Sequence, residues 1–70
     1  MQYVSVVLKN KSLMDCWVYV GAIDVYYLLA KYKLKIRVAE GENIYVVSSH
    51  QNIKNLGVVK PETKQLNIIF

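Results

Sequence analysis

The chain has 70 residues, of which nine are lysine or arginine and five are aspartate or glutamate, so its formal net charge is +4. This length predicts one small domain over residues 1–70, with a single core and a thin margin of stability. A hydrophobic fraction of 54% is high for that size. We therefore expect apolar side chains near the surface and a homo-oligomer in solution.

The sequence also indicates the cellular compartment of the protein. Cys16 is the only cysteine, which excludes the disulfide framework of a small secreted domain. Residues 1–5 lack the positive region that opens a signal peptide. The longest nearly apolar run, residues 16–30, is shorter than the about 20 residues that cross a bilayer. These features predict a cytoplasmic protein without membrane contact.

The first part of the chain predicts two strands. Residues 2–9 are rich in β-branched side chains, and residues 13–20 predict the returning strand of a hairpin around the polar loop 10–12. We expect the core faces of these strands to consist of Val4, Val6 and Leu8, and of Met14, Cys16, Val18 and Val20. Trp17 and Tyr19 would then lie on the opposite face, which requires a covering layer or a partner.

Residues 22–31 predict the main helix. Ile23, Tyr27 and Ala30 recur at helical spacing, and an aspartate in the first turn with a lysine in the last suits the helix dipole. A continuous strand through residues 25–29 is the alternative interpretation, because this segment is rich in aromatic and aliphatic side chains.

The second half of the chain predicts mostly strands. We expect strands at residues 33–39 and 44–48, then a short helical turn from His50 to Leu56. Residues 58–59 and 65–70 predict a closing hairpin whose turn contains the proline. The whole order is strand, strand, helix, strand, strand, short helical turn and C-terminal hairpin. It predicts a small α+β domain with an antiparallel sheet and one main helix.

The segment 31–38 alternates cations with apolar side chains. In a strand, Lys31, Lys33, Lys35 and Arg37 would share one face at intervals of about 6.6 Å. That spacing is close to the phosphate repeat of an extended nucleic-acid strand, so the row predicts a polyanion-binding site. The alternative is a solvated outer face whose lysines discourage edge-to-edge aggregation. Because lysine lacks the planar fork that reads base edges, we expect weak sequence selectivity.

Catalytic and metal-binding patterns find little support in the sequence. The single histidine, His50, has serine neighbours, but a triad is a spatial arrangement rather than a run of residues. Cys16 lies in a predicted strand, where a free cysteine usually behaves as a small buried hydrophobe. One cysteine and one histidine cannot fill a zinc site, and the three glycines lie too far apart for a phosphate-binding loop. We expect no enzymatic activity, cofactor, metal or small-molecule substrate.

The sequence thus predicts a small binding protein. Its first interpretation is contact with the nucleic-acid backbone, or with an acidic protein surface, through the row of cations. The alternative is a protein–protein interaction module, such as an inhibitor or regulator from a phage, virus or plasmid. Such a module would act through aromatic side chains or an open edge of the C-terminal strand. We expect its interaction surface to include Trp17, Tyr19, Tyr45 and Phe70.

Overall fold

The fold is known from a computed structural model, which describes residues 2–70. These residues form seven strands and no helix, so no helix in this range could cross a membrane. The strands are β1 (Tyr3–Asn10), β2 (Cys16–Val20), β3 (Asp24–Leu28), β4 (Lys33–Ala39), β5 (Asn43–Ser48), β6 (Ile53–Val58) and β7 (Gln65–Ile68). The predicted α+β fold with a main helix is therefore wrong, and the domain is all-β.

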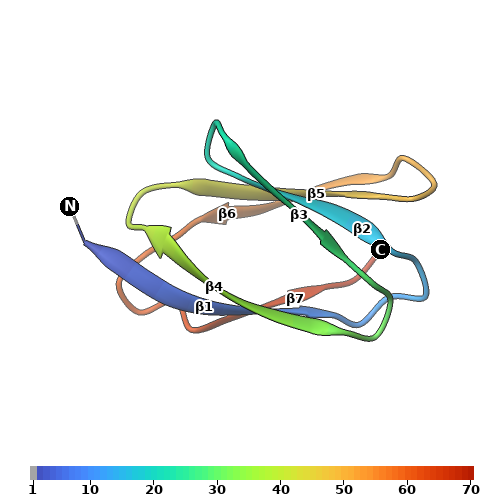
Figure 1. Ribbon diagram of the computed structural model, residues 1–70, viewed down its shortest axis with the longest axis horizontal. Helices are drawn as coiled ribbons and strands as arrows, with labels where there is room; N and C mark the ends of the chain where they lie inside the picture. The colour runs from blue at the N-terminus through green and yellow to red at the C-terminus, as the bar shows by residue number, and fades with distance from the viewer. Residues whose placement is uncertain (1) are drawn as a thin grey trace.

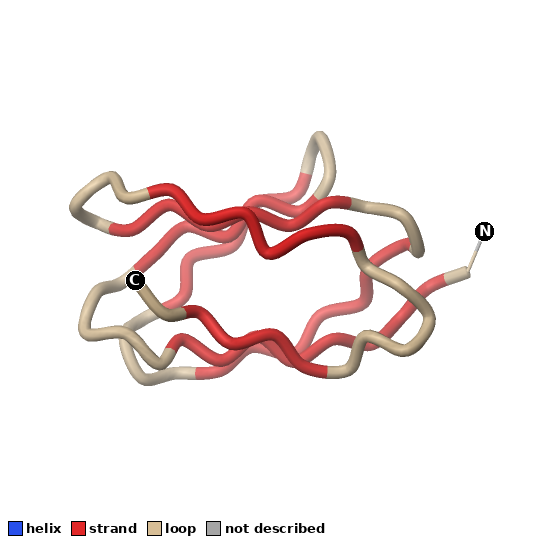
Figure 2. Tube along the Cα trace, turned by 180° about the vertical axis from the view of Figure 1, so that it is seen from behind, coloured by secondary structure: helices blue, strands red, loops and turns tan. Residues whose placement is uncertain are grey.

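Two sheets lie face to face and form a β-sandwich (Figures 1 and 2). One sheet has three strands in the order β4-β1-β7, and the other has four in the order β3-β2-β5-β6. Alternate side chains of each strand point into the space between the sheets, where aliphatic residues form a single core. The predicted core residues Val4, Val6, Leu8, Cys16, Val18 and Val20 are all buried, which confirms those faces. Met14 is only half-buried.

The predicted main helix is instead the strand β3, which confirms the alternative interpretation of this segment. It pairs antiparallel with β2, so that Tyr27 lies opposite Trp17. Aromatic and β-branched residues favour a strand when a partner edge is available. Gly21 has a φ of 61°, a backbone conformation that suits a tight turn between β2 and β3. Ile23 is 87% exposed, so its helical spacing with Tyr27 has no structural role.

The predicted short helical turn is also wrong, because residues 53–58 form β6 and pair antiparallel with β5. The loop between the two strands closes on Ser48, whose Oγ accepts the backbone N–H groups of His50 at 3.2 Å and Asn52 at 3.0 Å. This side chain thus satisfies the loop backbone and turns the chain back. Gly57, the residue directly after the predicted turn, lies within β6 at a φ of 97° beside an irregularity in the pairing.

The two predicted hairpins at the ends of the chain do not form. β1 and β2 lie in different sheets, as do β6 and β7. The neighbours of β1 are β4, which runs antiparallel, and β7, which runs parallel. The three-stranded sheet is therefore not purely antiparallel, and the C-terminal strand β7 lies at its edge. Where the connection between two consecutive strands crosses from one sheet to the other, those two strands cannot pair with each other.

Candidate functional site

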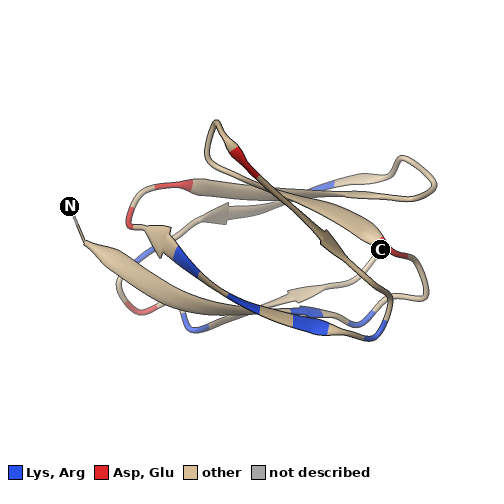
Figure 3. Ribbon diagram, in the orientation of Figure 1, with Lys and Arg blue, Asp and Glu red and all other residues tan. Residues whose placement is uncertain are grey.

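Several lysine and arginine residues lie along the strands of the three-stranded sheet (Figure 3). Lys33, Lys35 and Arg37 are exposed on β4, and Lys9 on β1 lies directly opposite Lys33. We call these four residues the basic face. The outward positions of the three strands are Tyr3, Ser5, Val7 and Lys9 on β1, Lys33, Lys35, Arg37 and Ala39 on β4, and Gln65 and Asn67 on β7. These positions hold four cations and no carboxylate.

The pairing of β1 with β4 brings like charges together. Side chains directly opposite each other on neighbouring antiparallel strands have Cβ atoms about 5 Å apart, and like charges at such positions are destabilising. Lys9 and Lys33 occupy such a pair of positions. Lys9 was not predicted as part of this site, because alternation places it on the outer side of its strand without showing which strand lies beside it.

Lys31 does not continue the row on β4. It lies in the turn before that strand with a φ of 67°, and its Nζ donates a hydrogen bond to the backbone oxygen of Lys11 at 2.9 Å. The predicted row of four cations is therefore a row of three on β4, and Lys31 lies in the turn just before the row begins. An open groove of about 770 Å³ lies there, lined by Lys9, Asn10, Lys11, Lys31, Tyr32 and Lys33.

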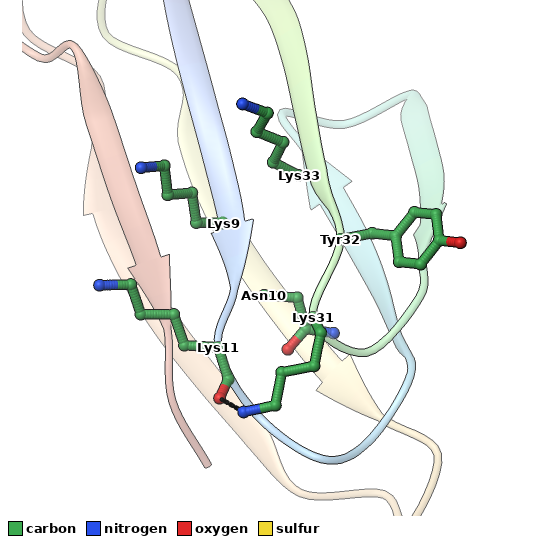
Figure 4. A pocket seen from close by; sticks show the side chains of 6 residues that line it. All are labelled: Lys9, Asn10, Lys11, Lys31, Tyr32 and Lys33. Atoms are coloured by element: carbon green, nitrogen blue, oxygen red, sulfur yellow. Dashed lines mark hydrogen bonds between the residues drawn. The ribbon is translucent and has the colours of Figure 1, made fainter.

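The close view of this groove shows how its side chains are directed (Figure 4). The side chains of Lys9, Lys11 and Lys33 extend to the same side of the sheet, whereas the ring of Tyr32 projects to the other side. Tyr32 is 64% exposed. The groove therefore offers ammonium groups on one side and an aromatic ring on the other, and the ring does not stack over the lysines.

A buried asparagine anchors both loops at this end of the sheet. The side chain of Asn10 is 1% exposed, and its Nδ2 donates to the backbone oxygens of Met14 at 2.8 Å and Leu28 at 3.2 Å. Its Oδ1 accepts the N–H of Ser12 at 3.0 Å. Its backbone N–H donates to the oxygen of Tyr32 at 2.9 Å. These bonds fix the loop after β1 and the turn before β4 to one buried residue.

Arg37 lies near the opposite end of the basic face. Its guanidinium carbon is 5.5 Å from the centre of the Tyr3 ring, a distance at which the cation is attracted to the ring. Tyr3 is 54% exposed. The contact orients the only arginine of the chain and leaves much of both side chains open to solvent.

The outer surface of the four-stranded sheet has a different chemistry. We call seven of its apolar residues the aromatic face: Trp17, Tyr19, Val25, Tyr27, Tyr45, Val47 and Ile53. The ring centres of Trp17 and Tyr27 are 4.5 Å apart, and those of Tyr19 and Tyr45 are 4.9 Å apart with nearly parallel planes. No charged residue occupies an outward position of these four strands.

The structure brings together three of the four residues predicted for an interaction surface. Trp17, Tyr19 and Tyr45 lie on the aromatic face, whereas Phe70 follows β7 and packs against the core. Tyr27 was missed because its segment was assigned to a helix. Its alternation with Tyr26 and Leu28 was the signal that could have placed it on this face.

The two side chains considered for nucleophilic chemistry lie apart from the basic face. Cys16 is fully buried, and this burial, together with the charge of Asp15, raises the pKa of its thiol to about 11. His50 is exposed, with its Nδ1 2.7 Å from the sulfur of Met14. Within residues 2–70, no three potential metal ligands come together.

The sandwich thus presents two outer surfaces, one basic and one aromatic, on opposite sides of a single core. No protein-family model, curated protein or solved structure matches this chain. Its function therefore has to be inferred from the chemistry of these two faces.

Proposed function

We propose that this protein is a non-enzymatic binding protein that holds a nucleic-acid backbone on its basic face. The observation that carries the proposal is the absence of any carboxylate among the outward positions of β1, β4 and β7, which hold four cations. Lys9 and Lys33 oppose each other there, and a bound phosphate would offset their repulsion. The proposal includes a cytoplasmic location, where such a nucleic acid would be met.

The spacing of the cations favours an extended polyanion. Successive outward residues of β4 lie about 6.6 Å apart, and β1 adds a cation on a second line about 4.8 Å away. Three of the four cations are lysines, which act as point charges and do not read base edges. Phosphate contacts of this kind position a nucleic acid without specifying its sequence. We therefore propose weak sequence selectivity.

The proposal is tested by fluorescence anisotropy with a labelled single-stranded oligonucleotide of mixed sequence. Neutralisation of about four phosphates predicts a slope near −3 when the logarithm of the association constant is plotted against that of the salt concentration. Lys35→Glu removes one contact and adds a repulsion, which together are worth about 2 kcal/mol, or a loss of affinity of roughly 30-fold. Salt screening lowers this figure toward tenfold.

Lys60→Glu is the matched control, because Lys60 is exposed in the connection between β6 and β7 and the substitution changes the net charge equally. We expect its affinity to stay within about twofold of the wild type, since it lies outside the basic face. Circular dichroism checks that both variants fold. The proposal fails if Lys35→Glu, correctly folded, binds the oligonucleotide as tightly as Lys60→Glu. Competition with polyglutamate distinguishes nucleic acid from an acidic protein surface. If the basic face binds nucleic acid, polyglutamate should displace the labelled oligonucleotide less well than unlabelled oligonucleotide does. If the two compete equally well, an acidic protein is the better candidate partner.

We propose as a second candidate function that the aromatic face binds protein, with a second copy of this chain as its occupant. Trp17 and Tyr27 are 46% and 48% exposed although they pack against each other. Aromatic residues dominate the energetics of protein interfaces. Two uncharged faces can meet without bringing the cations of two chains, each with a net charge of +4, close together.

This second candidate is tested by light scattering coupled to size exclusion. We expect a dimer at high protein concentration and a monomer for Trp17→Ala, which removes the largest side chain of the aromatic face. Lys35→Ala is the control, because Lys35 lies on the opposite side of the sandwich. A monomer of 8.1 kDa for the wild type at millimolar concentration would rule out the second copy as the occupant.

A further inference from the structure

Four lysines gather at one end of the three-stranded sheet. Lys9, Lys11, Lys31 and Lys33 line the groove of about 770 Å³ together with Asn10 and Tyr32. We call these four residues the lysine quartet. It concentrates four of the nine cations of the chain in a groove whose lining contains no acidic residue. This density differs from the row on β4, where single cations follow one another along the strand.

The backbone at Lys31 is unusual for its residue type. Its φ of 67° lies in the left-handed region, which residues other than glycine, asparagine and aspartate seldom adopt. The Lys31 side chain folds back so that its Nζ donates to the oxygen of Lys11 at 2.9 Å. An ammonium group has three donors, so two remain available to a ligand. The turn therefore holds a lysine beside Lys11 at a position whose left-handed backbone glycine would adopt more easily.

The backbone around the lysine quartet is fixed. The N–H of Lys11 donates to the oxygen of Ile68 at 2.9 Å, and the N–H of Asn10 donates to that of Tyr32 at 2.9 Å. The buried side chain of Asn10 bonds to both ends of the loop after β1 and to the end of β3. The four lysines thus extend from anchored backbone, and a ligand has to order only their side chains.

We propose that the lysine quartet is a separate subsite for a compact cluster of phosphoryl groups, as in a triphosphate end or inorganic polyphosphate. Several adjacent phosphoryl groups suit a groove lined by four lysines, three of which extend to the same side of the sheet while the fourth is held beside Lys11. The row on β4 instead suits one phosphate for each cation. Ammonium groups on flexible stems can follow phosphate oxygens in many directions. The inference rests on the proposed function in that both ligands share Lys9 and Lys33. Lys11 and Lys31 belong to the quartet alone.

The first test is isothermal titration calorimetry of the whole protein with tripolyphosphate and with orthophosphate. We expect tripolyphosphate to bind at least tenfold more tightly. Lys31→Gly removes the charge and keeps a residue that adopts the left-handed backbone. It should weaken tripolyphosphate binding about fivefold, the effect of one exposed charge contact. Lys11→Ala should do the same, and Lys60→Ala should have no effect.

The second test separates the two sources of the phosphoryl groups. Oligonucleotides of identical sequence with a 5′-triphosphate or a 5′-hydroxyl are compared by anisotropy. Tighter binding of the triphosphate form identifies a nucleic-acid end as the ligand, and equal binding with retained tripolyphosphate affinity identifies free polyphosphate. In both cases Lys35→Ala should weaken binding of the 5′-hydroxyl oligonucleotide and leave tripolyphosphate binding unchanged.

The inference is overturned if tripolyphosphate binds no better than orthophosphate, or if Lys31→Gly and Lys11→Ala bind it like the wild type. These results differ from those expected if the proposed function is wrong. If the proposed function is wrong, the 5′-hydroxyl oligonucleotide does not bind, or binds Lys35→Glu as tightly as the wild type. The tripolyphosphate results would still stand.

Discussion

Replacing Asn10 with alanine tests the argument that this buried residue holds the end of the sandwich together. The substitution removes the acceptor of the Ser12 N–H. It also removes one donor to the Leu28 oxygen, which keeps its ladder pairing with Cys16. The Ser12 hydroxyl lies 2.6 Å from Asn10 Oδ1 and 2.9 Å from the Met14 oxygen, so in the variant its single proton is free to bond to Met14. A buried polar group left without a partner costs about 1–3 kcal/mol. The unpaired Ser12 N–H, the lost hydrogen bond to Leu28 and a small cavity together predict a loss of about 3 kcal/mol, out of a total of roughly 4–10 kcal/mol for a domain of this size.

The measurement is urea unfolding followed by tryptophan fluorescence. With a dependence of about 1 kcal/mol per molar urea, the midpoint should fall by roughly 3 M. Asn67→Ala is the control, because Asn67 is exposed on β7 and its amide oxygen only accepts a bond from Gln65. It should change the free energy of unfolding by no more than about 0.5 kcal/mol. If Asn10→Ala costs less than about 1 kcal/mol, or no more than Asn67→Ala, the reasoning is refuted.

Further predictions concern the thiol and the carboxylate at the start of β2. The pKa of Cys16 is raised by burial and by Asp15 to about 11 from an ordinary value of about 9. Both states are protonated below pH 9, and between pH 9 and 11 only the unfolded thiol ionises. The free energy of unfolding should therefore fall over that range, by up to about 3 kcal/mol. Urea melts at pH 8 and 10.5 should show this fall in the wild type and a much smaller one in Cys16→Ala, where only Tyr27 remains, its pKa raised by its hydrogen bond to Asp15. Asp15→Ala should cost about 1–2 kcal/mol, since Oδ1 accepts the N–H of Ala30 at 2.8 Å. Tyr27→Phe should cost less than about 0.5 kcal/mol because its hydroxyl bond to Asp15 is exposed. Equal losses of stability for Asp15→Ala and Tyr27→Phe in thermal melts would contradict the conclusion that the bond to Ala30 matters more than the bond to Tyr27.

Local alternation allowed several surfaces to be predicted. The core face of β1 and the opposite placement of Trp17 follow from side chains two apart sharing a side. The same reasoning put Lys33, Lys35 and Arg37 on one exposed face. These features depend on the strand alone and not on its neighbours. At residues 22–31, local patterns were ambiguous, because aliphatic and aromatic side chains satisfied helical and strand spacing together. The partner edge of β2 decided between them.

By itself, the sequence determined a basic side of one strand, an aromatic side of another and the absence of a disulfide framework. Only the tertiary structure decided that Lys9 lies opposite Lys33, that Lys11 and Lys31 meet at the end of the sheet, and that Tyr27 packs against Trp17. The physical reason is that the period of a strand is set by its own backbone. Pairing and register depend on contacts between segments far apart in the chain, and no local pattern specifies which strand becomes the neighbour.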